Sequence, residues 1–150
     1  MRIFQKGQAI VEFAFVLPLF LLIIIGILNF GMIFMDYQSL NGIARSSARQ
    51  ASQITNDEYE KSGYKVVYDT YSKESLPVSI YQWDPSKRSD FKIEYIEASQ
   101  SVKVSLKAIP TTYGNGFFSL IYRVIGEKRA EGLFTLEIEY IMRSESAHDS

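Results

Sequence analysis

The hydrophobic pattern of the chain changes sharply near residue 35. Between Gln8 and Met35 the only ionisable side chain is Glu12, and the other interruptions are Pro18, Asn29 and two glycines. A helix rises ~1.5 Å per residue, so these 28 residues would extend ~42 Å against a hydrocarbon core of roughly 30 Å. The pattern therefore predicts one membrane-spanning helix that tilts, kinks at Pro18 or overhangs the hydrocarbon at one end.

Beyond Met35 the pattern remains helical but becomes amphipathic. Small and apolar residues share one helical face, namely Leu40, Ile43, Ala44, Ser47, Ala48 and Ala51. We expect this face to pack on the chain's own domain and the helix to extend over residues 36–62. Two alternatives remain near its end: Asn56-Asp57 ends the helix, or it begins a last turn through Lys61 that Gly63 caps.

From Tyr64 onward, aromatic and β-branched residues alternate with polar ones, a spacing typical of strands. Strands are expected at residues 64–70, 78–83, 91–96, 101–109 and 134–142. The break at Glu97–Gln100 predicts a hairpin loop between two of them. The last strand is long enough to pair with residues 101–109, which would bring lysines and glutamates together across the pair: Lys103 or Lys107 with Glu137 or Glu139.

These elements predict an α+β fold. A long N-terminal transmembrane helix continues into an amphipathic helix, which is packed on a small antiparallel β-sheet. Before the last strand, residues 111–116 are expected to form a loop, and residues 117–125 to form one or two apolar helical turns that cover the core.

Glu12 is the unusual residue of the apolar segment. An acidic side chain at the centre of a membrane helix costs about 2.5 to 3.5 kcal/mol, so a retained one usually has a partner or a function. One interpretation is that Glu12 lies near the membrane edge and reaches the headgroups. The other is that Glu12 pairs with a positive group at the same depth, which cleavage between Gly7 and Gln8 would create.

The flanking charges predict the orientation of this helix. Arg2 and Lys6 precede the apolar segment and Asp36 follows it, so the positive-inside rule places the N-terminus in the cytoplasm and the C-terminal domain outside it. A conventional cleaved signal peptide is the alternative. Its apolar region should be only about 7 to 15 residues long and end in a small-x-small site, and this segment does neither.

The residues around Glu12 resemble a known signal. A short basic leader ending in Gly7, a glutamate five residues later, then Phe13 and a long apolar helix are similar to the class III signal of type IV pilin-like proteins. The resemblance continues through three segments, Gly7–Pro18, Gly26–Gly31 and Ala44–Arg49. Over residues 7–52 the chain resembles the TadE-like minor pilins, or pseudopilins, of tight-adherence pilus systems, with Pro18, Arg45 and Arg49 among the motif positions.

The resemblance implies a membrane-inserted precursor that a prepilin peptidase cuts after Gly7. Gln8 would become the N-terminus, and the Glu12 carboxylate would meet its free or methylated amine, in the same chain or in a neighbour during assembly. Phe13 matches the Glu-Phe variant of the pseudopilins, whereas the major pilins of these systems tend to carry Glu-Tyr. The implied partners are the membrane, the prepilin peptidase, other pilin and pseudopilin subunits and the pilus assembly platform.

Together, these features divide the chain into five parts. They are a prepilin leader at 1–7, a transmembrane helix at 8–35, an amphipathic helix extension at 36–62, an extracytoplasmic antiparallel sheet domain at 63–145 and a polar tail at 146–150.

Composition excludes several functions. A net charge of −1 provides no footprint for nucleic acid, and the absence of cysteine excludes disulfides and thiolate metal sites. One histidine, His148, cannot supply a two-histidine metal site, and the polar segment around it is not expected to form a catalytic triad. No glycine-rich phosphate loop and no paired acid and base are evident. We therefore expect no enzymatic activity, no catalytic residues, no metal and no cofactor.

One alternative of a different class stays open. The domain could be a permanently anchored, single-pass adhesin or receptor, in which case the Gly7 and Glu12 pattern would be coincidental.

Overall fold

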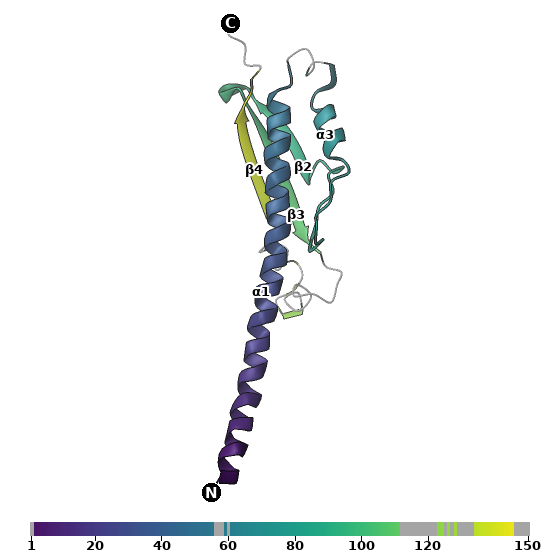
Figure 1. Ribbon diagram of the computed structural model, residues 1–150. Coiled ribbons are helices and arrows are strands. Elements are labelled where there is room, and N and C mark those ends of the chain that lie inside the picture. Colours follow the sequence, from purple (N-terminus) through teal and green to yellow (C-terminus); the bar gives the residue numbers. More distant parts are fainter. Residues whose placement is uncertain are drawn as a thin grey trace. The chain divides into compact units, whose positions relative to one another are not determined.

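The computed structural model describes residues 2–55, 59, 61–111, 123–124, 126, 128 and 134–145 (Figure 1). The expected tail at 146–150 lies outside these residues, as does most of the expected loop and apolar turns at 111–125. The chain forms two compact units, Met1–Phe34 and Met35–Ser150. Its α+β composition, with a long apolar helix and a small antiparallel sheet, confirms the predicted fold class.

Helix α1 (Arg2–Ser52) is continuous through Pro18. Its part from Gln8 onward contains an 18-residue window with a mean hydropathy of 2.8, and none of that window is buried within the protein. By length and composition this helix can cross a membrane. A proline is tolerated in such a helix because neighbouring groups can re-satisfy the carbonyl that lacks an N–H partner.

The C-terminal part of α1 buries the face that the sequence predicted. All six residues of that face are buried: Leu40, Ile43, Ala44, Ser47, Ala48 and Ala51. The one hydroxyl among them is satisfied inside the helix, because Ser47 Oγ donates to the carbonyl of Ile43 at 2.7 Å. Small side chains at these positions allow the helix backbone to lie close to the elements it covers, so packing is dense without large residues.

Helix α1 ends at Ser52 rather than continuing to residue 62. The amides of Gln53 and Ile54 donate to carbonyls three residues earlier, which tightens the last turn. The Glu145 amide, from the far end of the chain, donates to the Ser52 carbonyl at 2.9 Å. Asn56 and Asp57, on which the two sequence alternatives depend, lie outside the described residues. Gly63 has the positive φ of a capping glycine, +56°, and its amide donates to the Tyr59 carbonyl at 2.7 Å.

The sheet is built around its longest strand, β3 (Ser101–Pro110). Strands β2 (Phe91–Ile96) and β4 (Leu136–Arg143) pair with it antiparallel, as does the short β1 (Tyr81–Gln82). The turn η1 (Glu97–Ser99) and Gln100 in the left-handed region connect β2 to β3, which confirms the predicted hairpin. The predicted pairing of the last strand with β3 is also confirmed.

Alternation along the strands separates a dry face from a charged one. The dry face consists of Phe91, Ile93, Val102, Val104, Leu106, Ala108 and Ile138, all buried. On the opposite face Lys107 binds Glu137 at 2.9 Å and Lys103 binds Glu139 at 2.6 Å, as the sequence predicted. These pairs are largely exposed, so each contributes about 0 to 1 kcal/mol and their main effect is to keep this face hydrated.

The prediction of a strand at residues 64–70 is wrong. Residues 65–70 belong to helix α3 (Lys65–Tyr71). In this helix Val67 is buried, and Tyr68 and Tyr71 pack their rings on Phe91 at centroid distances of 5.0 and 6.3 Å. Positions 67, 68 and 71 share one face of a helix but not of a strand. The helix also covers the edge of β2, because the Ile93 amide donates to the Tyr68 hydroxyl oxygen at 2.8 Å.

A cluster of tyrosines lies beside α3. The rings of Tyr59 and Tyr64 are 5.1 Å apart between centroids. Burial of Tyr64, followed by the charges that neighbouring tyrosines would carry when ionised, raises the pKa of its phenol to about 12. This phenol therefore stays neutral at every physiological pH.

The strand expected at 78–83 is reduced to the two residues of β1 because the preceding backbone is bound to a side chain instead. The Asp36 carboxylate is fully buried. Its Oδ1 accepts the Val78 amide at 3.0 Å, and its Oδ2 accepts the amides of Ile80 and Tyr81 at 2.9 and 3.2 Å. Ser79, between these donors, has φ +57°, which lets the amides converge on one carboxylate.

Candidate functional site

The predicted N-terminal site lies on one side of α1. Gln8 and Glu12 are one helical turn apart, and Gln8 Nε2 donates to Glu12 Oε1 at 3.2 Å. In the uncut chain the backbone nitrogen of Gln8 is a peptide amide, so the Gln8 carboxamide is the group that meets the carboxylate. No other described group donates to Glu12. A single long bond from a neutral donor leaves most of the carboxylate's hydrogen-bonding capacity unused.

The Gly7-Gln8 junction lies inside the helical backbone of α1. A peptidase acts on a locally extended chain, so any cleavage here would require the first turns of the helix to open. Glycine loses more conformational freedom in a helix than any other residue, which makes opening at Gly7 comparatively easy.

The apolar side chains around this site have no protein cover. Phe13 is 63% exposed, and Ile10, Leu19 and Leu22 are exposed to a similar degree. A contiguous unburied apolar surface of this length is compatible only with lipid or with other apolar helices. The segment that carries Gln8 and Glu12 is therefore suited to a membrane and to association with neighbouring helices.

The two motif arginines belong to the other unit of the chain, Met35–Ser150. Arg45 and Arg49 are both exposed and one helical turn apart, on the side of α1 away from its buried face. Neither forms an ion pair with a described residue. Their charges are therefore available to solvent.

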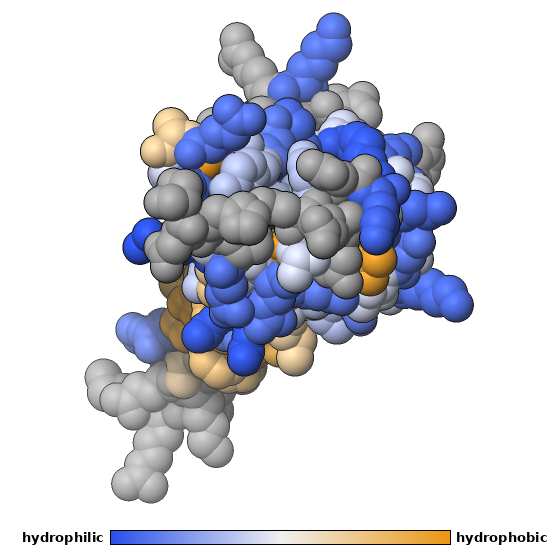
Figure 2. Space-filling view, turned by 90° about the horizontal axis from the view of Figure 1, so that it is seen from above, coloured by the Kyte–Doolittle hydropathy of each residue, from blue (hydrophilic) through white to orange (hydrophobic). Residues whose placement is uncertain are grey.

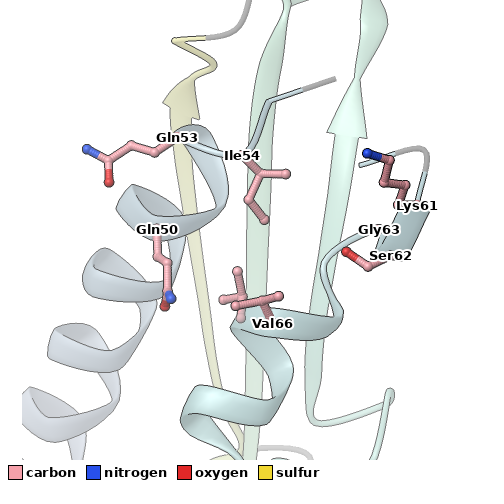
Figure 3. A pocket seen from close by; sticks show the side chains of 8 residues that line it. Gln50, Gln53, Ile54, Lys61, Ser62, Gly63 and Val66 are labelled. Atoms are coloured by element: carbon pink, nitrogen blue, oxygen red, sulfur yellow. The ribbon is translucent and has the colours of Figure 1, made fainter. Parts of the chain in front are cut away.

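A hollow in the unit Met35–Ser150 lies between the end of α1 and the start of α3 (Figure 3). This pocket, of about 370 Å³, is lined by Gln50, Gln53, Ile54, Lys61, Ser62, Gly63, Val66 and Val67. Apolar walls and two carboxamides surround it, and Lys61 is its one titratable side chain. That set contains no acid–base pair and no activated nucleophile, so it provides no catalytic chemistry.

The other described surface features also provide no catalytic or metal site. The end of the molecule seen in Figure 2 carries mainly hydrophilic side chains with isolated hydrophobic ones. Within the described ranges, no three metal-ligating side chains gather at one place. His148 lies outside the described residues.

A long, unburied apolar helix at the N-terminus, together with an α+β unit, fits the class of single-pass membrane proteins. Within this class, residues 7–49 match the family model described as TadE-like protein. The resemblance that the sequence predicted is thus confirmed over these residues, which are similar to the family of TadE-like proteins. This family is structural rather than enzymatic. No curated protein and no solved structure matches the chain.

Proposed function

We propose that this chain is a minor pilin, or pseudopilin, that a prepilin peptidase processes after Gly7 and that takes part in assembling a tight-adherence pilus. Its place would be in priming, at the tip or at the base. The observation that carries the proposal is the position of Gly7, Gln8 and Glu12 at the start of the TadE-like segment. The partners would be the peptidase, other pilin and pseudopilin subunits and the assembly platform.

Cleavage would change the chemistry of the site. It would turn the Gln8 peptide nitrogen into a charged α-amine on the same turn that already holds Gln8 near Glu12. A cation and a carboxylate at the same depth neutralise each other where hydration is poor, whereas either alone is costly. The amine could belong to the same chain or to a neighbour, and in the second case the pair would join two subunits.

The Gly7→Val variant should remain uncut. A β-branched side chain at the cleaved position would obstruct the extended backbone that the peptidase grips, whereas glycine presents no side chain there. Intact-protein mass spectrometry of the membrane form measures this directly, because cleavage removes Met1–Gly7. Ala14→Val is the matched control, since it adds a similar bulk within the same helix but away from the junction, and it should be cut normally.

The decisive sample is the wild-type protein from its own host. If its mass still includes Met1, the processing proposal is wrong, and the permanently anchored adhesin or receptor becomes the better account.

The unit Met35–Ser150 should lie outside the cytoplasm. This expectation rests on Arg2 and Lys6 before the apolar segment and Asp36 after it. A phosphatase that is active only after export, fused at His148, should be active, and a reporter that needs the cytoplasm should be inactive at the same place. The reverse pattern would contradict the orientation and with it the pseudopilin function.

A further inference from the structure

Asn29 is a second polar side chain that the apolar segment must accommodate, and the charge pair proposed for Glu12 does not involve it. It follows Glu12 by 17 residues and precedes Met35 by six, which places it about 25 Å and about 9 Å from them along the helix. If Glu12 marks one edge of the hydrocarbon, Asn29 lies inside the hydrocarbon, toward its far side. An amide at this depth needs a hydrogen-bonding partner.

The structure shows how far the helix satisfies this need by itself. Asn29 Nδ2 donates to the Ile25 carbonyl at 2.7 Å. That bond directs the side chain back toward the N-terminus, further into the span, and not toward the nearer end where headgroups could solvate it. One N–H and the carbonyl oxygen of the carboxamide are left without a partner among the described residues.

The neighbouring surface on the same side of the helix is open. Gly26 is three residues before Asn29, so the two lie on one face. A Cβ added at Gly26 would meet nothing within 4 Å. No contact within the described chain therefore requires a glycine at this position. A small residue beside a polar one is the arrangement that allows two membrane helices to approach and form a hydrogen bond between them.

We propose that Gly26 and Asn29 form a contact in the membrane with the same residues of a second copy of this chain. A second copy is the occupant that the geometry favours, because the free groups of the carboxamide are one donor and one acceptor and are therefore complementary to themselves. Two copies inserted in the same orientation also hold Asn29 at the same depth. The contact is about 25 Å from Glu12 and does not depend on cleavage.

The absence of cysteine in the chain makes disulfide cross-linking a clean measurement. The full-length protein is expressed in membranes that contain no other pilus protein, with Ile33→Cys as the reporter on the proposed face. Ile27→Cys is the matched control. Ile27 precedes Asn29 by two residues and is therefore rotated from it by about 200° around the helix. After oxidation, Ile33→Cys should form a dimer and Ile27→Cys should not.

Three further substitutions in the Ile33→Cys background test the residues themselves. Asn29→Leu should raise the dissociation constant of the dimer about 3- to 30-fold, the range measured for hydrogen bonds between membrane helices. Gly26→Leu should weaken the dimer at least as much by blocking the approach. Gly31→Leu is the control, because Gly31 lies on another side and a Cβ there also meets nothing within 4 Å; it should leave the dimer unchanged.

The outcomes separate this contact from its alternatives. Equal cross-linking of the two cysteine variants, or an Asn29→Leu dimer as abundant as the wild type, would overturn the proposal. So would a cross-link that forms only when another pilus subunit is expressed in the same membrane. Gly7→Val added to Ile33→Cys should leave the dimer in place, so failure of the processing proposal and failure of this one can be told apart.

Discussion

The Asp36→Ala variant is expected to lose a large part of the stability of the unit Met35–Ser150. The substitution removes the acceptor of three amides, those of Val78, Ile80 and Tyr81, at a fully buried position. Leaving buried donors without a partner costs about 1 to 3 kcal/mol each. A total on the order of 3 kcal/mol or more is a large part of the roughly 5 to 15 kcal/mol that holds a domain folded.

Thermal unfolding of the detergent-solubilised protein, followed by circular dichroism, measures this loss. Asp69→Ala is the matched control, because Asp69 is exposed on α3 and its replacement should change stability by no more than about 0.5 kcal/mol. Asp36→Asn should also destabilise the unit, because its new Nδ2 donor would face at least one backbone donor. An Asp36→Ala protein that unfolds at the wild-type temperature would show that these amides have other partners.

The Glu12→Gln variant is expected to abolish pilus assembly while the protein still accumulates in the membrane. Glutamine keeps the shape of the side chain and an oxygen that can accept the bond from Gln8 Nε2, so only the charge is lost. The α-amine created by cleavage would then have no anionic partner at low dielectric. Removing one member of such a pair costs about 3 to 5 kcal/mol.

Pilus counts by electron microscopy, together with immunoblots of the membrane fraction, distinguish assembly from insertion. Glu12→Ala should insert at least as well as the wild type, because a carboxylate is removed from an apolar segment, and cleavage after Gly7 should survive at least in part. Glu137→Gln, the same change on the exposed face of the sheet, should assemble normally. Normal pilus numbers with Glu12→Gln would contradict the charge-pair mechanism, and Glu12 would then be a carboxylate that reaches the headgroups.

Helix faces, strand faces and contacts between near neighbours could be predicted, because each depends on residues only a few positions apart in the sequence. Gln8 and Glu12 meet because they are four residues apart on one helix. The buried face of α1 follows from the spacing between Leu40 and Ala51, and strands β2 and β3 follow from strict alternation on either side of a short turn.

Helix α3 could not be predicted in the same way. Residues 64–70 contain valines and tyrosines that suit a strand, and seven helical residues are too few to form a stable helix alone. Contacts with Phe91 and Ile93, more than twenty residues later, stabilise the helical form of this segment. The signal in the sequence that favoured a helix was the spacing of Val67, Tyr68 and Tyr71, which share one face of a helix but not of a strand.

By itself, the sequence determined the apolar helix, its TadE-like segment, the charged and buried faces of the main strands and the contact between Gln8 and Glu12. All of these depend on periodicity or on neighbours within one helical turn. The tertiary structure alone decided where α1 ends, through the Glu145 amide, and why β1 is short, through Asp36. The physical reason is distance along the chain: the donors to Asp36 lie 42 to 45 residues away, so only the folded chain brings a buried carboxylate and its amides together.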